Sequence, residues 1–111
     1  EITENGRIRF NKPAIDKFFG GDVPPRVYLA FDRVRGRIGV LPTLDESPAT
    51  FKTKKLRSGD FSIPSKPFFK RFNIDLPTGG ISGINISLES HEGNPLIVLE
   101  VDSLKDHSID K

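Results

Sequence analysis

The sequence contains no cysteine, methionine or tryptophan, and only one tyrosine and two histidines among its 111 residues. Without cysteine the chain can form no disulfide, no thiolate metal site and no thiol nucleophile. It also lacks the long apolar run of a bilayer-spanning helix and the basic-then-apolar pattern of a signal peptide. We therefore expect a soluble, cytoplasmic protein that does not enter a membrane, built as a single domain over residues 1–111.

Residue patterns that would support catalysis are lacking as well. His91 falls in an expected turn and His107 in the polar tail, and neither has the spacing to a second ligand that a metal site requires. The adjacent acids Asp45 and Glu46 lie in an expected linker, where solvent would leave them chemically ordinary. We therefore predict a protein that is not an enzyme and that has no cofactor and no bound metal.

Charge is present in both signs but is unevenly distributed. The chain has 17 Lys and Arg against 15 Asp and Glu, a formal net charge of +2. Between residues 51 and 75, seven cations face only two acids, whereas residues 76–111 hold two cations and six acids. A basic segment of this kind has two interpretations: a binding site for a phosphate-bearing partner, or a solvated strand edge that Lys protects from aggregation.

A short motif occurs twice along the chain. The segment 11–18 (NKPAIDKF) recurs 54 residues later at 65–72 (SKPFFKRF), and each copy follows a strand pattern that begins at a glycine, Gly6 or Gly59. The repeat predicts two copies of one supersecondary unit. The expected boundaries are residues 4–42 and 51–101 for the two units, 44–50 for the linker between them, and 103–111 for a polar tail.

Each unit is expected to have the order strand, helix, strand, strand, on the basis of apolar periodicity and turn residues. The elements expected in the first unit are a strand over 6–10, a helix over 12–19, and a hairpin with strands over 26–32 and 38–42. Those expected in the second unit are strands over 51–56 and 61–63, a helix over 66–72, and a hairpin with strands over 84–89 and 96–101. Because isolated hairpins are marginal in water, we expect one shared core in a mostly β, α+β fold with pseudo-two-fold symmetry.

Small residues are expected to delimit the two helices. Asn11 and Ser65 are predicted N-caps, each followed by proline in the first turn. Gly20 and Gly21 end the first helix because glycine readily adopts the left-handed conformation, and Asn73 takes that place after the second helix.

Arginines form two clusters. Arg7 and Arg9 share the outward face of the first strand, while Arg33, Arg35 and Arg37 crowd the turn of the first hairpin. Guanidinium groups suit phosphate because each can bond two oxygens at once, and the alternative is ordinary solubilising charge. The phenylalanines fall mostly at the core spacing of the helices, so packing is preferred over base stacking as their interpretation.

The repeat resembles a known family. The segment 6–12 (GRIRFNK), the helix end Phe18-Phe19-Gly20, and the hairpin segments 26–29 and 38–42 resemble the AbrB/SpoVT/MazE family of swapped-hairpin domains. Two such units in one chain are similar in arrangement to MraZ. The resemblance implies a swapped-hairpin barrel in a DNA-binding regulator or antitoxin.

The resemblance also implies which residues reach DNA. Its Gly-Arg position falls on Gly6 and Arg7, and its basic residue at the start of the helix falls on Lys12. In the second unit Asp60 replaces the arginine that would follow the glycine, and only Lys66 at the start of the helix is retained. A symmetric footprint on DNA is therefore not expected.

The leading hypothesis from the sequence is a non-catalytic DNA-binding protein, most simply a transcriptional regulator that contacts double-stranded DNA. The expected phosphate contacts are Arg7, Arg9, Lys12, Arg33, Arg35, Arg37, Lys52, Lys54, Lys55, Arg57 and Lys66. The alternative is a protein-interaction module, antitoxin-like or phage-encoded, which does not bind nucleic acid and has an exposed patch near residues 89–102. Single-stranded nucleic-acid binding is a third interpretation and requires exposed aromatic rings beside the basic strand. Both a homodimer and another protein partner stay open.

Overall fold

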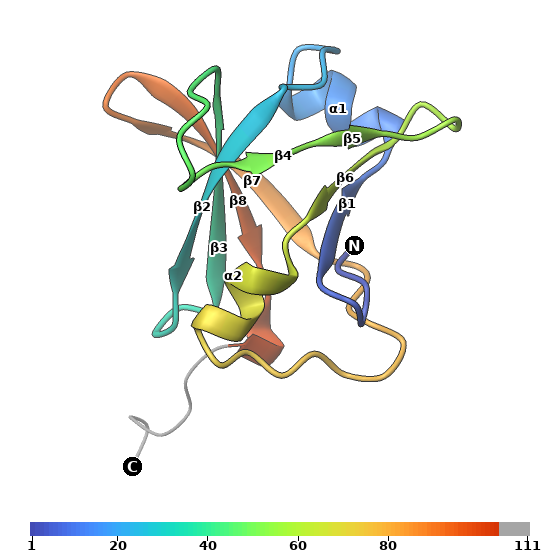
Figure 1. Cartoon of the computed structure of the whole chain (residues 1–111), viewed down its shortest axis with the longest axis vertical. Helices are drawn as coiled ribbons and strands as arrows, with labels where there is room; N and C mark the ends of the chain where they lie inside the picture. The colour runs from blue at the N-terminus through green and yellow to red at the C-terminus, as the bar shows by residue number, and fades with distance from the viewer. Residues whose placement is uncertain (105–111) are drawn as a thin grey trace.

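The computed structural model describes residues 1–104, which form two antiparallel sheets and two short helices in a mostly β, α+β arrangement, as predicted (Figure 1). The first half contains β1 (Arg7–Phe10), α1 (Lys12–Phe18), β2 (Arg26–Asp32) and β3 (Arg37–Thr43). The second half contains β4 (Phe51–Lys52), β5 (Lys54–Lys55), β6 (Phe61–Pro64), α2 (Lys66–Arg71), β7 (Asn85–His91), β8 (Asn94–Glu100) and a 3₁₀ turn (Asp102–Leu104). The order β1-α1-β2-β3 therefore recurs as β6-α2-β7-β8.

The smaller sheet joins the two sequence repeats directly. Its strand order is β1-β6-β5, and β1 runs antiparallel to β6 with Ile8 opposite Ile63 and Phe10 opposite Phe61. These four side chains are almost completely buried, and the Phe10 and Phe61 rings stack with their centroids 5.1 Å apart. Because side chains alternate along a strand, Arg9 and Ser62 project from the opposite face of the sheet, where Ser62 is nevertheless buried.

The larger sheet contains both hairpins. Its strand order is β4-β2-β3-β8-β7, and the hairpins β2–β3 and β7–β8 are joined through β3 and β8, with Ile38 opposite Leu99 and Val40 opposite Ile97. All four of these side chains are buried. Each hairpin would be marginal alone, so this pairing stabilises both.

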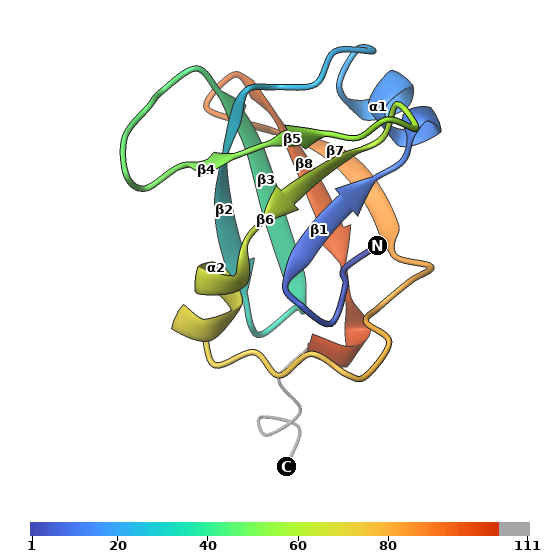
Figure 2. The same ribbon diagram turned by 45° about the vertical axis from the view of Figure 1, so that its right-hand side comes forward.

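The core lies between the two sheets, and α2 covers one side of it (Figure 2). Phe68 and Phe69 of α2 are buried in this core. No closed barrel forms among the described residues, because their strands belong to two separate sheets. The chain passes between the sheets at β4 and β5, which have only two residues each, and the bridges of Ile2 to Ile8 and Ile81 are isolated ones that extend neither ladder. A barrel needs continuous ladders around its whole circumference.

The strand expected over residues 51–56 is divided at Thr53, which corrects a second prediction. The residues before Thr53 pair with β2 in the larger sheet, and those after it pair with β6 in the smaller one. Thr53 turns the chain between them, since both its N–H and its hydroxyl donate to the Pro25 carbonyl at 3.2 Å, and the hydroxyl also donates to the Pro24 carbonyl. These contacts are distant in sequence, so local patterning could not reveal them.

The two helices begin differently. Asn11 caps α1 as predicted, because its Oδ1 accepts a hydrogen bond from the Ala14 N–H at 3.0 Å. The predicted side-chain cap at Ser65 is wrong: this fully buried hydroxyl donates instead to the carbonyls of Gly6 at 3.0 Å and Ile63 at 2.9 Å. Ser65 therefore ties the second repeat to the first.

The helix ends agree with the prediction. Gly20, Gly21 and Asn73 have φ values of +65°, +85° and +54°, in the left-handed region. Part of the polar tail expected at 103–111 lies outside the described residues. Within the described residues, no helix is long and apolar enough to cross a membrane.

Candidate nucleic-acid interface

Cations line the outer face of the smaller sheet. The strands β1, β6 and β5 lie side by side (Figure 2). Arg9, Ser62 and Lys54 occupy facing positions on these strands, so their side chains project from the same face of the sheet. Adjacent strands lie about 4.8 Å apart, which places the backbones of Arg9 and Lys54 about 10 Å from each other. Arg7, opposite Pro64, shares this face because it lies two residues before Arg9. We call this surface the basic face.

Two reciprocal contacts place a lysine at each end of the basic face. At one end Gly6, with φ +81°, lies against the first residue of α2, and a Cβ on Gly6 would be 2.9 Å from Lys66 Cα. At the other end Gly59, with φ +90°, lies against the first residue of α1, and a Cβ there would be 3.4 Å from Lys12 Cδ. The glycine that leads each repeat therefore contacts the first helical lysine of the other repeat.

One arginine of the basic face is neutralised within the protein. The Asp60 carboxylate accepts a hydrogen bond from Arg9 Nη2 at 2.8 Å and another from the Lys12 N–H at 3.1 Å. These bonds, chiefly that from Arg9, hold the pKa of the Asp60 carboxyl below its usual range against the opposing effect of burial. Asp60 thus links β6 to β1 and α1, whereas Arg7 has no carboxylate partner among the described residues.

The basic segment after the linker runs along the edge of the smaller sheet. Lys54 and Lys55 form β5, Arg57 lies in the turn to β6, and Lys52 lies on β4 in the larger sheet. All four side chains are exposed. Within residues 1–104 none of them has a carboxylate oxygen within 4.0 Å, so their charge is available to a partner.

The arginine cluster of the first hairpin lies elsewhere. The β2–β3 turn is at the opposite end of β2 from the strands of the basic face (Figure 1). Each of its arginines is bonded to an acceptor of the protein itself. The partners are the Phe72 carbonyl for Arg33, the Asp32 carboxylate at 3.7 Å for Arg35, and the carboxylates of Glu100 at 3.0 Å and Glu89 at 3.6 Å for Arg37. The structure therefore separates this cluster from the basic face.

Sequence reasoning missed Asp60 as the partner of Arg9. A signal was present, because Asp60 and Ser62 alternate with the apolar Phe61 and Ile63, which predicts that they lie on the opposite face of the chain from these two residues. What could not be read was the pairing of β6 with β1, which brings residues 51 positions apart together.

The aromatic side chains do not contribute to the basic face. All nine phenylalanines and the single tyrosine are buried or half-buried. The described residues therefore offer no exposed ring on which bases of a single strand could stack, which counts against the single-strand interpretation.

Comparison with known proteins adds no relative. No family model, no curated protein and no solved structure matches the chain. The resemblance to swapped-hairpin domains accordingly rests on the motifs and on the order of elements.

Proposed function

We propose that this chain is a non-catalytic DNA-binding protein, most simply a transcriptional regulator, whose basic face contacts the phosphate backbone of a duplex. One observation carries the proposal: Arg7, Lys54 and Lys66 come from three different elements around one small sheet, and none has a carboxylate partner among residues 1–104. Cations that are not neutralised internally are free to replace the counterions of a nucleic acid.

The proposal extends to the architecture. We interpret the two repeats as fused swapped-hairpin units of the AbrB/SpoVT/MazE kind, in an open rather than closed arrangement. Three features support this interpretation: the recurring element order, the antiparallel pairing of β1 with β6, and the reciprocal contacts of Gly6 with Lys66 and Gly59 with Lys12. The contacts are asymmetric, because Asp60 in the second unit neutralises Arg9 of the first.

The test is a fluorescence-anisotropy titration of a labelled duplex of mixed sequence, at about 50 mM and about 200 mM salt. Affinity should fall steeply between the two concentrations, and each lost phosphate contact should reduce the slope of log K against log salt by about 0.9. The triple variant Arg7→Ala, Lys54→Ala, Lys66→Ala removes three cations that have no carboxylate partner within residues 1–104, and it should lose both affinity and slope.

A matched control is the variant Arg35→Ala, which removes an exposed cation of the other arginine cluster. It should bind the duplex like the wild type. Absence of any binding at the lower salt concentration would refute the proposed function. If the triple variant and the control lose the same affinity for the duplex per charge removed, the basic face is not the binding surface.

A further inference from the structure

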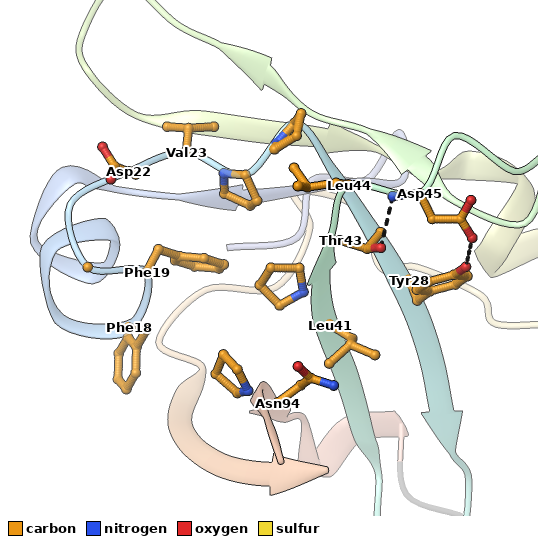
Figure 3. A pocket seen from close by; sticks show the side chains of 15 residues that line it. Phe18, Phe19, Asp22, Val23, Tyr28, Leu41, Thr43, Leu44, Asp45 and Asn94 are labelled. Carbon is orange, nitrogen blue, oxygen red and sulfur yellow. Dashed lines mark hydrogen bonds between the residues drawn. The ribbon is translucent and has the colours of Figure 1, made fainter. Parts of the chain in front are cut away.

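A second surface feature lies apart from the cations. An open groove of about 890 Å³ runs between the C-terminal end of α1, the segment leading into β2, and the ends of β3 and β8 (Figure 3). Its volume is in the range of sites that hold a small ligand or a few residues of a peptide. Phe19 lies on one side of the groove and Leu41 and Asn94 on another (Figure 3).

The walls of the groove are apolar and are attached to the core. The Phe19 ring packs edge-on against Phe10 and Phe61, at centroid distances of 5.0 and 5.2 Å, and also lines the groove. A wall supported in this way is preformed, so a ligand need not order it. Much of the remaining wall consists of prolines: Pro24, Pro25, Pro42 and Pro95.

The polar groups of the groove favour positive charge. Four of the lining residues are prolines, which have no N–H to donate, and the carbonyls of Pro24 and Pro25 already accept hydrogen bonds from Thr53. Asp22 and Asp45 also line the groove, whereas none of the lining residues is Lys, Arg or His. The Tyr28 hydroxyl donates a hydrogen bond to Asp45 (Figure 3), and this bond lowers the pKa of the Asp45 carboxyl, which keeps it ionised.

The rim carries an apolar side chain with nothing over it. Leu44 is 82 % exposed, the highest value among the large hydrophobic residues that are exposed in the described part of the chain. Exposed apolar surface beside a preformed groove is typical of an interaction site. A nucleic acid does not suit this groove, because its phosphates would meet two carboxylates.

We propose that this groove binds an extended apolar segment of a partner protein that carries a lysine or arginine next to its apolar side chains. Charge complementarity selects the cation, since Asp22 and Asp45 are the only charged residues in the lining. Strand addition does not suit the site, because a strand needs alternating donors and acceptors, and the prolines of the wall have no N–H to donate. The groove would thus add a protein partner to the DNA-binding proposal, on a different surface.

The test uses two labelled peptides and fluorescence anisotropy. One probe is an N-acetylated heptapeptide of proline and leucine that ends in an arginine amide, and the other has glutamate in place of the arginine. Proline keeps both probes extended and so lowers the entropy lost on binding. The arginine probe should bind, and the glutamate probe should bind at least about fivefold more weakly, as expected for a partly exposed charge pair.

Two substitutions locate the binding site. Leu44→Ser should weaken binding of the arginine probe about tenfold, the loss of one buried leucine contact. Asp45→Asn retains an acceptor for Tyr28 and should weaken the arginine probe about three- to fivefold while sparing the glutamate probe. Val34→Ser is the control, because Val34 is also exposed but lies in the β2–β3 turn, and it should change nothing.

Several results would overturn the proposal. The first is that the arginine probe does not bind at about 1 mM. The second is that both probes bind equally well. The third is that Leu44→Ser and Val34→Ser change the affinity for the arginine probe by the same factor. Sedimentation that shows a dimer abolished by Leu44→Ser, with no peptide binding, would assign the groove to a second copy of the chain. Leu44→Ser should leave duplex DNA affinity unchanged, so failure here is separable from failure of the DNA-binding proposal.

Discussion

Gly6→Ala should destabilise the fold far more than an ordinary glycine substitution, because Gly6 is where the first repeat contacts the second. Its φ is +81°, and a Cβ would lie 2.9 Å from Lys66 Cα and 3.3 Å from Lys66 N. The obstructing atoms belong to the backbone at the start of α2, so no side-chain rotation relieves the contact. The carbonyl of Gly6 also accepts both the N–H and the hydroxyl of Ser65.

Two unfavourable contributions add at this position. A left-handed conformation costs an alanine about 1–2 kcal/mol relative to glycine. Overpacking against a fixed backbone costs about a further 1–3 kcal/mol. The reduced flexibility of the unfolded chain offsets roughly 0.4–1 kcal/mol of this sum. The net loss in the free energy of unfolding should therefore be about 1–5 kcal/mol.

Urea unfolding followed by far-UV circular dichroism measures this loss, and Gly79→Ala is the matched control. Gly79 has nearly the same φ, +85°, but a Cβ there would have no atom within 4 Å. It should bear the conformational cost alone, about 1 kcal/mol or less after the unfolded-state offset. The urea dependence of the unfolding free energy should be the same in both variants, because the surface exposed on unfolding does not change.

The decisive quantity is the difference between the two variants. A difference of about 1–3 kcal/mol supports a close contact between the repeats at Gly6. If Gly6→Ala and Gly79→Ala lose the same free energy within about 0.5 kcal/mol, the packing of Gly6 against α2 is not as described. In that case the position of Lys66 on the basic face would have to be revised.

Three further predictions concern single side chains. Folding lowers the pKa of Asp60, chiefly through its bond to Arg9. This bond therefore stabilises the fold at pH values above the unfolded pKa of about 3.9, and the stabilisation is lost as the pH falls through the folded pKa. Asp60→Asn should flatten the acid limb of a curve of unfolding free energy against pH. The Asp45 carboxylate accepts a hydrogen bond from the neutral phenol of Tyr28 and so raises the pKa of Tyr28. Because Tyr28 is the only tyrosine of the chain, an ultraviolet titration should show a single midpoint above about 10. Asp45→Asn should lower this midpoint. Ser65→Ala removes a buried hydroxyl that donates to two carbonyls and should cost about 1 kcal/mol in urea unfolding; an unchanged midpoint would contradict its role in joining the repeats.

Local signals in the sequence were sufficient for most elements. The strand over 26–32 has the predicted bounds, and the helix predicted over 12–19 ends one residue early, at Phe18. Periodicity and helix-ending residues succeed here because they act within a few residues of the chain. The split at Thr53 and the buried role of Ser65 were not predictable in this way, since both depend on carbonyl groups far away in the sequence.

Some features of the candidate site were likewise predictable from the local sequence, and others depended on the tertiary structure. The amino-acid sequence by itself determined that Arg7 and Arg9 point outward, because alternation on one strand is a local property. Only the tertiary structure decided that Asp60 neutralises Arg9 and that Lys54 joins the same face, since both follow from pairing β1, β6 and β5. The absence of cysteine by itself excluded disulfides, thiolate metal sites and thiol nucleophiles, whatever the fold. Strand register also decided which cations of the basic face have a carboxylate partner among the described residues, and no local segment contains that register.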